Sequence, residues 1–190
     1  MGLSSNVPGM GVGEPALDVN ERSRHDGPIV LADYDDAWPA RFEREARRIR
    51  TALGVRALLV EHAGSTSVPR LAAKPIIDIV LAVPDSSAED EYVPALEAEG
   101  YVLRIREPDW YEHRMLKKAD PNVQVHVFSE GCEEIDRMLA FRDHLRESTA
   151  DRGLYERTKR ELAAQHWEYV QDYADAKSEV VEEIIARALV

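Results

Sequence analysis

The sequence has one cysteine, no long apolar run and too few basic residues to balance its acids. Cys132 stands alone among 190 residues, so neither an intrachain disulfide framework nor a cysteine-rich zinc site is expected. No stretch of about 20 apolar residues occurs, so we expect no membrane-spanning helix. The N-terminus also lacks a basic region followed by an apolar core, and the default expectation is therefore a cytoplasmic protein.

The excess of acidic residues limits the kinds of molecule that the protein is expected to bind. Asp and Glu number 36 against 24 Lys and Arg, which gives a formal net charge of −12. Nucleic acids and anionic membranes are bound through surplus Lys and Arg, so broad binding of either kind is not expected. A local group of basic side chains can still hold a small phosphorylated ligand. The hydrophobic fraction of 44% and charged fraction of 32% are typical of a soluble globular protein.

The chain divides into a leader and one domain. Residues 1–28 are rich in Gly, Pro, Ser and Asn and show no hydrophobic periodicity, which predicts a disordered leader. Residues 29–190 are long enough for a single domain with its own core.

The apolar periodicity predicts strands mixed with helices, followed by helices alone. Phe42, Ala46, Ile49 and Leu53 fall on one helical stripe that Gly54 ends. The early elements are therefore a short strand at 29–31, a helix over 38–53, strands at 56–61 and 76–83, an acidic helix over 86–99, and strands at 101–105, 113–117 and 122–128. From about residue 131 the period is 3.6, and helices are expected over 133–146, 151–173 and 175–189. The pattern indicates an α+β protein with a helical C-terminal third.

The first group of candidate binding residues lies in the turn after the strand at 56–61. Gly64 is followed by three hydroxyl residues, Ser65, Thr66 and Ser67, a combination that can present backbone N–H groups and hydroxyls to a phosphate. Gly-Ser turns are common, so the turn alone is a weak signal.

Asp78 strengthens that signal, because it is the single carboxylate of the apolar strand at 76–83. Burying an ionised carboxylate costs several kcal/mol unless the group is paired or binds a metal. Three interpretations stay open: Asp78 pairs with Lys74 or an arginine, it lies at the solvated end of the strand, or it binds a divalent metal opposite the turn.

Three further residues are candidate ligands. His126 alternates with Gln124 on one side of the strand at 122–128 and shares a face with Asp78 if the two strands are neighbours. The alternative for His126 is a half-buried, hydrogen-bonded histidine. Glu61 and His62 enter the turn and are also candidate metal ligands, although His62 could instead orient the loop.

Basic residues supply the candidate phosphate contacts. Lys74 and Arg114, with Lys117 and Lys118, stand out in an acidic chain. Clustered in a cleft they would attract a phosphate-bearing ligand, whereas scattered they form a solvated strand face.

Four segments in this order resemble the GrpB family: Glu61 to Pro69, Lys74 to Ile79, Val125 to Phe128, and Phe141 to Asp143. The resemblance extends from about Val30 to the C-terminus and includes Tyr155 with Lys159 and Tyr173 through Lys177. It implies the fold of the nucleotidyltransferase superfamily, a mixed sheet with flanking helices. Related domains are fused behind dephospho-CoA kinase, which implies a role in partner binding or folding assistance as an alternative.

By position, Gly64 and Ser65 match the superfamily's Gly-Ser turn and Asp78 matches the first acid of its metal-binding pair. Val80 stands where the resemblance implies a second acid, and Gln124 and His126 stand where a later strand carries a third. The resemblance therefore implies one of two states. Either Glu61 or His126 completes a reduced site for Mg²⁺ or Mn²⁺, or the pocket binds ligand without the transfer chemistry.

Two functions follow as hypotheses. The first is metal-dependent nucleotidyl transfer to a small-molecule acceptor, with Asp78, His126 and Lys74 as the catalytic residues. The second is a binding or regulatory module that recognises a nucleotide, a CoA-like phosphate or a protein partner.

Overall fold

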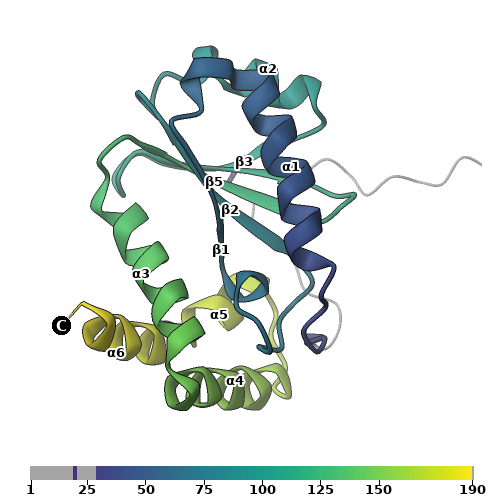
Figure 1. The fold of residues 1–190 in the computed structure, drawn as a ribbon, viewed down its shortest axis with the longest axis vertical. Helices are drawn as coiled ribbons and strands as arrows, with labels where there is room; N and C mark the ends of the chain where they lie inside the picture. The colour runs from purple at the N-terminus through teal and green to yellow at the C-terminus, as the bar shows by residue number, and fades with distance from the viewer. Residues whose placement is uncertain (1–18, 21–28, 190) are drawn as a thin grey trace, which may run out of the picture.

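A five-stranded sheet forms the centre of the computed structural model, which describes residues 19–20 and 29–189 (Figure 1). The strand order is β1-β2-β5-β4-β3, and only the β2–β5 pair is parallel. The strands are β1 (Leu59–Ala63), β2 (Ile77–Val83), β3 (Val102–Glu107), β4 (His113–Lys118) and β5 (Val123–Ser129). The sheet is therefore mixed, as expected. Apart from residues 19–20, the predicted leader of residues 1–28 lies outside the described residues.

Helices lie on both sides of this sheet and at one end of it. Helix α1 (Trp38–Leu53) and the short α2 (Val93–Ala98) cover one face. Helix α3 (Glu133–Glu147) packs on the other face, and α4 (Thr149–Ala163), α5 (Val170–Asp175) and α6 (Ser178–Ala188) gather at the end where the turn after β1 lies (Figure 1). Three short 3-10 turns complete the order: η1 (Gly54–Arg56), η2 (Ser65–Ser67) and η3 (Glu89–Glu91). The α+β class and the helical C-terminal third are confirmed.

Strand alternation gives the two faces different characters. Ile79, Leu81 and Val125 are fully buried under α1 and α2. On the other face Val80 and Phe128 pack against Ile135 of α3. Asp78 and His126 belong to this second face, because residues two apart on a strand share a side. Since α3 covers only part of that face, polar groups can remain there.

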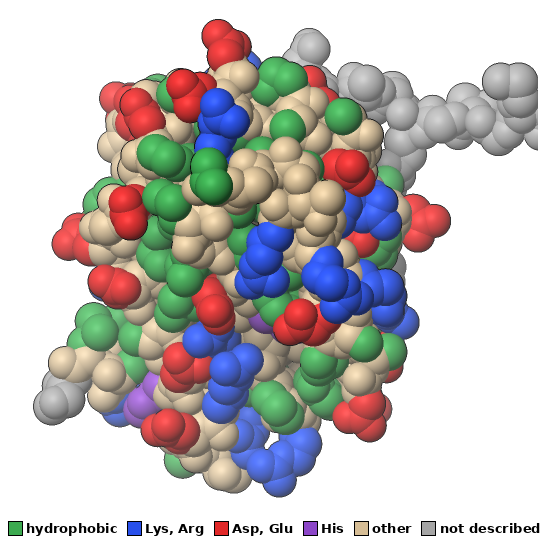
Figure 2. Space-filling model, turned by 45° about the horizontal axis from the view of Figure 1, so that its top comes forward, with side chains coloured by type: hydrophobic (Ala, Val, Ile, Leu, Met, Phe, Trp, Pro, Cys, Tyr) green, Lys and Arg blue, Asp and Glu red, His purple; other side chains and the backbone are tan. Residues whose placement is uncertain are grey.

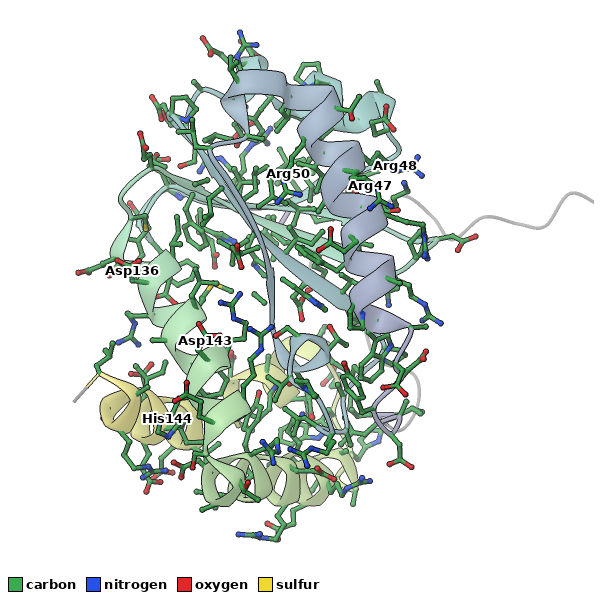
Figure 3. The ribbon with its side chains drawn as sticks, viewed as in Figure 1. Arg47, Arg48, Arg50, Asp136, Asp143 and His144 are labelled. Carbon is green, nitrogen blue, oxygen red and sulfur yellow. The ribbon has the colours of Figure 1, made fainter. Side chains whose placement is uncertain are left out.

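Helix α1 shows how the first face is fixed. The helix has the predicted bounds and ends at Gly54, whose φ of 56° is left-handed. Arg50, labelled in Figure 3, reaches from α1 to β1 and donates from Nη2 to the Val60 carbonyl at 2.9 Å. Its neighbours Arg47 and Arg48 are exposed on the same helix. This polar contact adds to the apolar stripe in setting the position of α1 over the sheet.

Three predicted elements differ from the structure. The segment 29–31 forms no named strand; an isolated bridge joins Ala32 to Ala73 instead. The helix expected over 86–99 shrinks to η3 and α2, because the Asp85 carboxylate accepts bonds from the backbone N–H and hydroxyl of Ser87 and holds a turn. The helix expected over 151–173 is interrupted between α4 and α5.

That interruption is stabilised by Trp167, whose indole N–H donates to the carbonyl of Leu162 at 2.7 Å and so satisfies an acceptor in the last turn of α4. The indole also meets the ring of Tyr173 edge-on at 6.2 Å. The chain can therefore turn and bring α5 back toward the sheet, which the helical period does not predict. None of the helices in the described ranges is long and apolar enough to cross a membrane.

Candidate functional site

The Gly-Ser turn lies against Asp78, and we call the region around the turn and the Asp78 carboxylate the hollow. Ala63, the last residue of β1, pairs with Asp78 near the start of β2. Gly64 then turns the chain with φ 63° and ψ −174°, and the Asp78 side chain lies directly against its Cα. The predicted juxtaposition of turn and carboxylate is therefore present in the structure.

Only one of the three turn hydroxyls faces this hollow. The Ser65 hydroxyl accepts a hydrogen bond from Nζ of Lys159 at 3.1 Å. The Thr66 hydroxyl donates to the carbonyl of Ile76 at 2.8 Å, and the Ser67 hydroxyl donates to the carbonyl of Gly64 at 2.6 Å. Thr66 and Ser67 therefore hold the shape of the turn, and their side chains are not placed as phosphate ligands.

His62 lies on the opposite face of the sheet from Asp78. Its ring stacks on Phe42 of α1 with centroids 4.7 Å apart, and Nε2 lies 3.1 Å from the Thr66 hydroxyl. Burial lowers the pKa of His62 to about 4, so the ring is neutral at physiological pH. The structure thus supports the loop-orienting alternative for His62 and does not bring it to the predicted metal site.

Glu61 shares the face of Asp78 but is paired with Arg142. Nη1 of Arg142 lies 2.8 Å from Oε2 of Glu61, and the same guanidinium donates to both carboxylate oxygens of Asp143. Figure 3 labels Asp143 on the side of α3 that faces β1. Arg142 is 8% exposed, and its bond to the His62 carbonyl fixes α3 to β1. Glu61 therefore holds α3 in place rather than standing ready as a ligand.

Arg114 is also turned away from the hollow. It pairs with Val127 in the sheet, and both residues point to the α1 side. Its guanidinium binds Glu89 of η3 and Glu112, and these contacts help to raise its pKa against the effect of burial. The structure does not bring Arg114 to Asp78 and the turn, because strand alternation places it on the other face.

His126 lies beside Asp78, and His113 and Glu107 continue the row of polar contacts beyond His126. Nε2 of His126 lies 3.7 Å from Oδ1 of Asp78. Nδ1 of His126 lies 3.2 Å from Nε2 of His113 in β4, and Nδ1 of His113 lies 2.7 Å from Oε2 of Glu107 in β3. Trp110 packs edge-on against His113 at 5.1 Å and is 42% exposed.

Lysines from three separate segments lie near the turn and Asp78: Lys74 and Lys177 interact electrostatically with the Asp78 carboxylate, and Lys159 contacts Ser65 of the turn. Lys74 precedes β2, Lys159 lies on α4, and Lys177 lies between α5 and α6. Burial lowers the pKa of Lys74 to about 8 and that of Lys159 to about 7, and in both cases the charge of Lys177 lowers it further. The charge of Asp78 opposes this effect at Lys74 and Lys177. Within the described ranges none of these three lysines forms an ion pair with a carboxylate.

Two tyrosines hold the lysines. The Tyr173 ring lies under Nζ of both Lys74 and Lys177, at 5.3 and 4.6 Å from the centroid. The Tyr155 ring lies 4.7 Å from Nζ of Lys159, which also donates to the carbonyl of Ala72. Tyr173 is 1% exposed, and its hydroxyl has no hydrogen-bond partner in the described part of the chain.

The donor set fits a cation shared with a phosphate better than an all-protein metal cage. No group of three or more His, Cys, Asp or Glu side chains is arranged to hold a metal among the residues described. Asp78 and His126 offer two ligand atoms 3.7 Å apart. In phosphate-handling sites Mg²⁺ takes one or two protein carboxylates and completes its shell with phosphate and water.

Sequence reasoning missed Lys159, Lys177, Tyr173 and the Glu107–His113 pair. Tyr155 with Lys159 and Tyr173 with Lys177 repeat the same spacing of four residues, which would place each pair on one face if both segments were helical. In the structure each tyrosine ring contacts the lysine four residues after it. The repeated spacing was the signal that could have found them. Basic side chains also gather in the middle and lower part of the face in Figure 2, interrupted by acidic ones.

The chain is similar to several known proteins. The profile of the GrpB protein family matches residues 28–187. UPF0157 protein BH1888 of Halalkalibacterium halodurans is 59% identical over 172 residues, covering 90% of this chain and 88% of that protein. The crystal structure of conserved protein GrpB from Enterococcus faecalis superimposes with a TM-score of 0.75 at 35% identity, covering 84% of this chain and 97% of that chain. A dephospho-CoA kinase of Mycolicibacterium paratuberculosis is 33% identical over 171 residues, covering 76% of this chain but 42% of the kinase.

Proposed function

The chain belongs to the GrpB family, and from its site we propose that it binds a phosphorylated small molecule, a nucleotide in the first place. The phosphates lie in the hollow between the Gly64–Ser65 turn, Asp78 and the C-terminal helices. The observation that carries this proposal is a group of three lysines beside the turn and Asp78. Lys74 and Lys177 interact with the Asp78 carboxylate, and Lys159 donates to the Ser65 hydroxyl and interacts with Lys177.

The positive charge of the three lysines exceeds the negative charge of Asp78 unless an anion binds. Burial lowers the pKa of all three lysines, so each ammonium pays a desolvation cost that one carboxylate does not offset. A bound phosphate would be stabilised by charge-assisted hydrogen bonds from the ammonium groups and would raise their pKa values again.

The Tyr173 hydroxyl supports the same conclusion. A buried hydroxyl without a partner costs about 1–3 kcal/mol, and native proteins rarely retain one without a reason. Its ring already contacts two of the lysines, so a ligand oxygen in the hollow is a suitable partner for this hydroxyl.

Nucleotidyl transfer is the second candidate, favoured by the Asp78–His126 pair. Asp78 and His126 would hold Mg²⁺ or Mn²⁺, and the metal ion would supply polarisation of the reacting phosphate. The chain's own residues orient the phosphates at the turn and neutralise their charge through the lysines. Because Val80 replaces a second acid, positive charge that a second metal ion would bring comes from ammonium groups. The related dephospho-CoA kinases suggest a CoA-like phosphate, or a protein partner, as an alternative ligand.

Thermal unfolding tests the proposal. ATP, GTP, CTP and UTP are compared with the corresponding nucleosides, each with and without Mg²⁺ or Mn²⁺. Ligand at 100 times its Kd stabilises the folded state by about 2.7 kcal/mol, so nucleotides but not nucleosides should raise the Tm. A rise that requires metal in the wild type and is absent in Asp78→Asn favours transfer chemistry, whereas a rise without metal favours plain phosphate binding. If no phosphorylated compound raises the Tm, the proposal is wrong.

A further inference from the structure

Four polar side chains, one from each of four adjacent strands, form a file across the sheet. In order from the edge they are Glu107 of β3, His113 of β4, His126 of β5 and Asp78 of β2. The successive contacts are 2.7 Å from Glu107 Oε2 to His113 Nδ1, 3.2 Å from His113 Nε2 to His126 Nδ1, and 3.7 Å from His126 Nε2 to Asp78 Oδ1. The file crosses the sheet diagonally, because Met115 and Val80, not His113 and Asp78, are the direct register partners of His126.

The hydrogen bonds of this file have one consistent direction when Glu107 is ionised. A carboxylate only accepts, so Nδ1 of His113 must carry a proton. A neutral imidazole has one N–H and one lone pair, so Nε2 of His113 then accepts. Nδ1 of His126 must therefore donate, which leaves the lone pair of His126 on Nε2, the atom that faces Asp78.

Packing keeps His113 in this arrangement. It is 3% exposed, its ring lies nearly parallel to that of His126 with centroids 5.3 Å apart, and it stacks on Phe128 at 4.8 Å. Trp110 closes the outer side of the ring. The ring has little freedom to turn, so its acceptor nitrogen stays directed at His126.

We propose that Glu107 and His113 are positioning residues that fix His126 as its Nδ1–H tautomer, so that His126 Nε2 and Asp78 form a two-point site for a divalent cation. The inference rests on the proposed function, since the phosphorylated ligand completes the coordination of that cation. A metal-binding histidine usually donates its other N–H to an acceptor that fixes the tautomer. Here that acceptor is a second histidine, which is itself held by a carboxylate.

The test reads the tautomer directly and then the metal affinity. Long-range ¹H–¹⁵N correlation spectra of the ¹⁵N-labelled full chain at pH 8 should show His126 protonated at Nδ1 and not at Nε2. His113→Phe keeps the stacked ring but removes the acceptor, so protonation of His126 should shift toward Nε2. In the same variant the affinity for Mn²⁺ alone, measured from the electron paramagnetic resonance of unbound Mn²⁺, should fall about 10–100-fold. His166→Phe, an exposed histidine outside the file, is the matched control and should change neither readout.

A second variant changes Glu107, the residue that holds His113. The Glu107 side chain is half-exposed, so its replacement disturbs the fold less than replacement of a buried residue. Glu107→Leu should mix the tautomers of His126, whereas Glu107→Gln keeps an acceptor oxygen and should preserve the wild-type spectrum. The inference is overturned if wild-type His126 carries its proton on Nε2, if both His113→Phe and Glu107→Leu leave the spectrum unchanged, or if Mn²⁺ does not bind. The tautomer and Mn²⁺ measurements need no nucleotide. Positive results in both, without any stabilisation by phosphorylated compounds, would therefore reject the proposed function and keep this inference.

Discussion

A β-carbon built on Gly64 would lie 2.2 Å from Oδ2 of Asp78. The glycine is therefore required twice, once by its φ of +63° and once by the carboxylate that occupies the space of a side chain. Gly64→Ala should lower the free energy of unfolding by about 2–4 kcal/mol, from left-handed strain plus overpacking. It should also displace Asp78 and abolish Mn²⁺ and nucleotide binding. Urea denaturation and calorimetric titration measure the two effects.

Gly54 offers the matched control for that variant. Its φ is +56°, and a β-carbon there would meet nothing within 4 Å. Gly54→Ala should therefore show the backbone strain alone, about 1–2 kcal/mol, with ligand binding unchanged. Equal losses in the two variants would contradict the close approach of Gly64 to Asp78.

Removing the ammonium group of Lys177 should have different effects on thermal stability and on nucleotide affinity. Lys177→Met keeps the apolar length of the side chain but relieves repulsion with Lys74 and Lys159, so the Tm of the protein alone should stay level or rise. Nucleotide affinity should fall at least tenfold, about 1.4 kcal/mol, because a charge-assisted contact is lost. Lys118→Met, on the opposite face and paired with Glu45, should lower the Tm and leave the affinity unchanged. A drop in Tm for Lys177→Met with unchanged affinity would contradict an anion site.

The lowered pKa values of Lys74 and Lys159, about 8 and about 7, predict opposite pH trends for stability and binding. Between these values and the ordinary lysine pKa of 10.5, the unfolded chain binds more protons than the folded one. Folding stability should therefore rise as pH increases from about 7 toward 10. Phosphate affinity should fall over the same interval, since the ammonium groups lose their charge. Urea midpoints and titrations across this range measure both trends, and Lys159→Met should flatten the first.

Variants of Arg142 and Glu61 test whether Glu61 anchors α3 rather than binding a metal ion. Arg142→Met removes the link from α3 to β1 and leaves the buried His62 carbonyl without this donor, so it should cost about 1–3 kcal/mol of stability. Glu61→Gln retains an acceptor for Arg142 and should cost about 1 kcal/mol or less. Its affinity for Mn²⁺ should equal that of the wild type, measured by the same resonance assay. A tenfold loss of Mn²⁺ affinity in Glu61→Gln would restore Glu61 as a ligand.

Local patterns predicted the parts of the site that lie on strands. Alternation placed His126 and Asp78 on one face, and the two central strands proved to be neighbours. The same rule, applied to Arg114 and His113, would have assigned the arginine to the covered face and the histidine to the site. Period two decides such questions only when the register between strands is known. A shift of one residue moves every side chain of a strand to the other face.

By itself, the sequence determined the α+β class, the bounds of α1, the Gly-Ser turn and Asp78 as its neighbouring acid. These features depend on periods and spacings within short segments of the chain. Only the tertiary structure decided which charges meet. Lys159 reaches Ser65 across 94 residues of sequence, and Lys177 returns to the same hollow after the chain breaks its helix near Trp167. The physical reason is that electrostatic balance depends on distance in space. Helix packing sets that distance, and no local period records it.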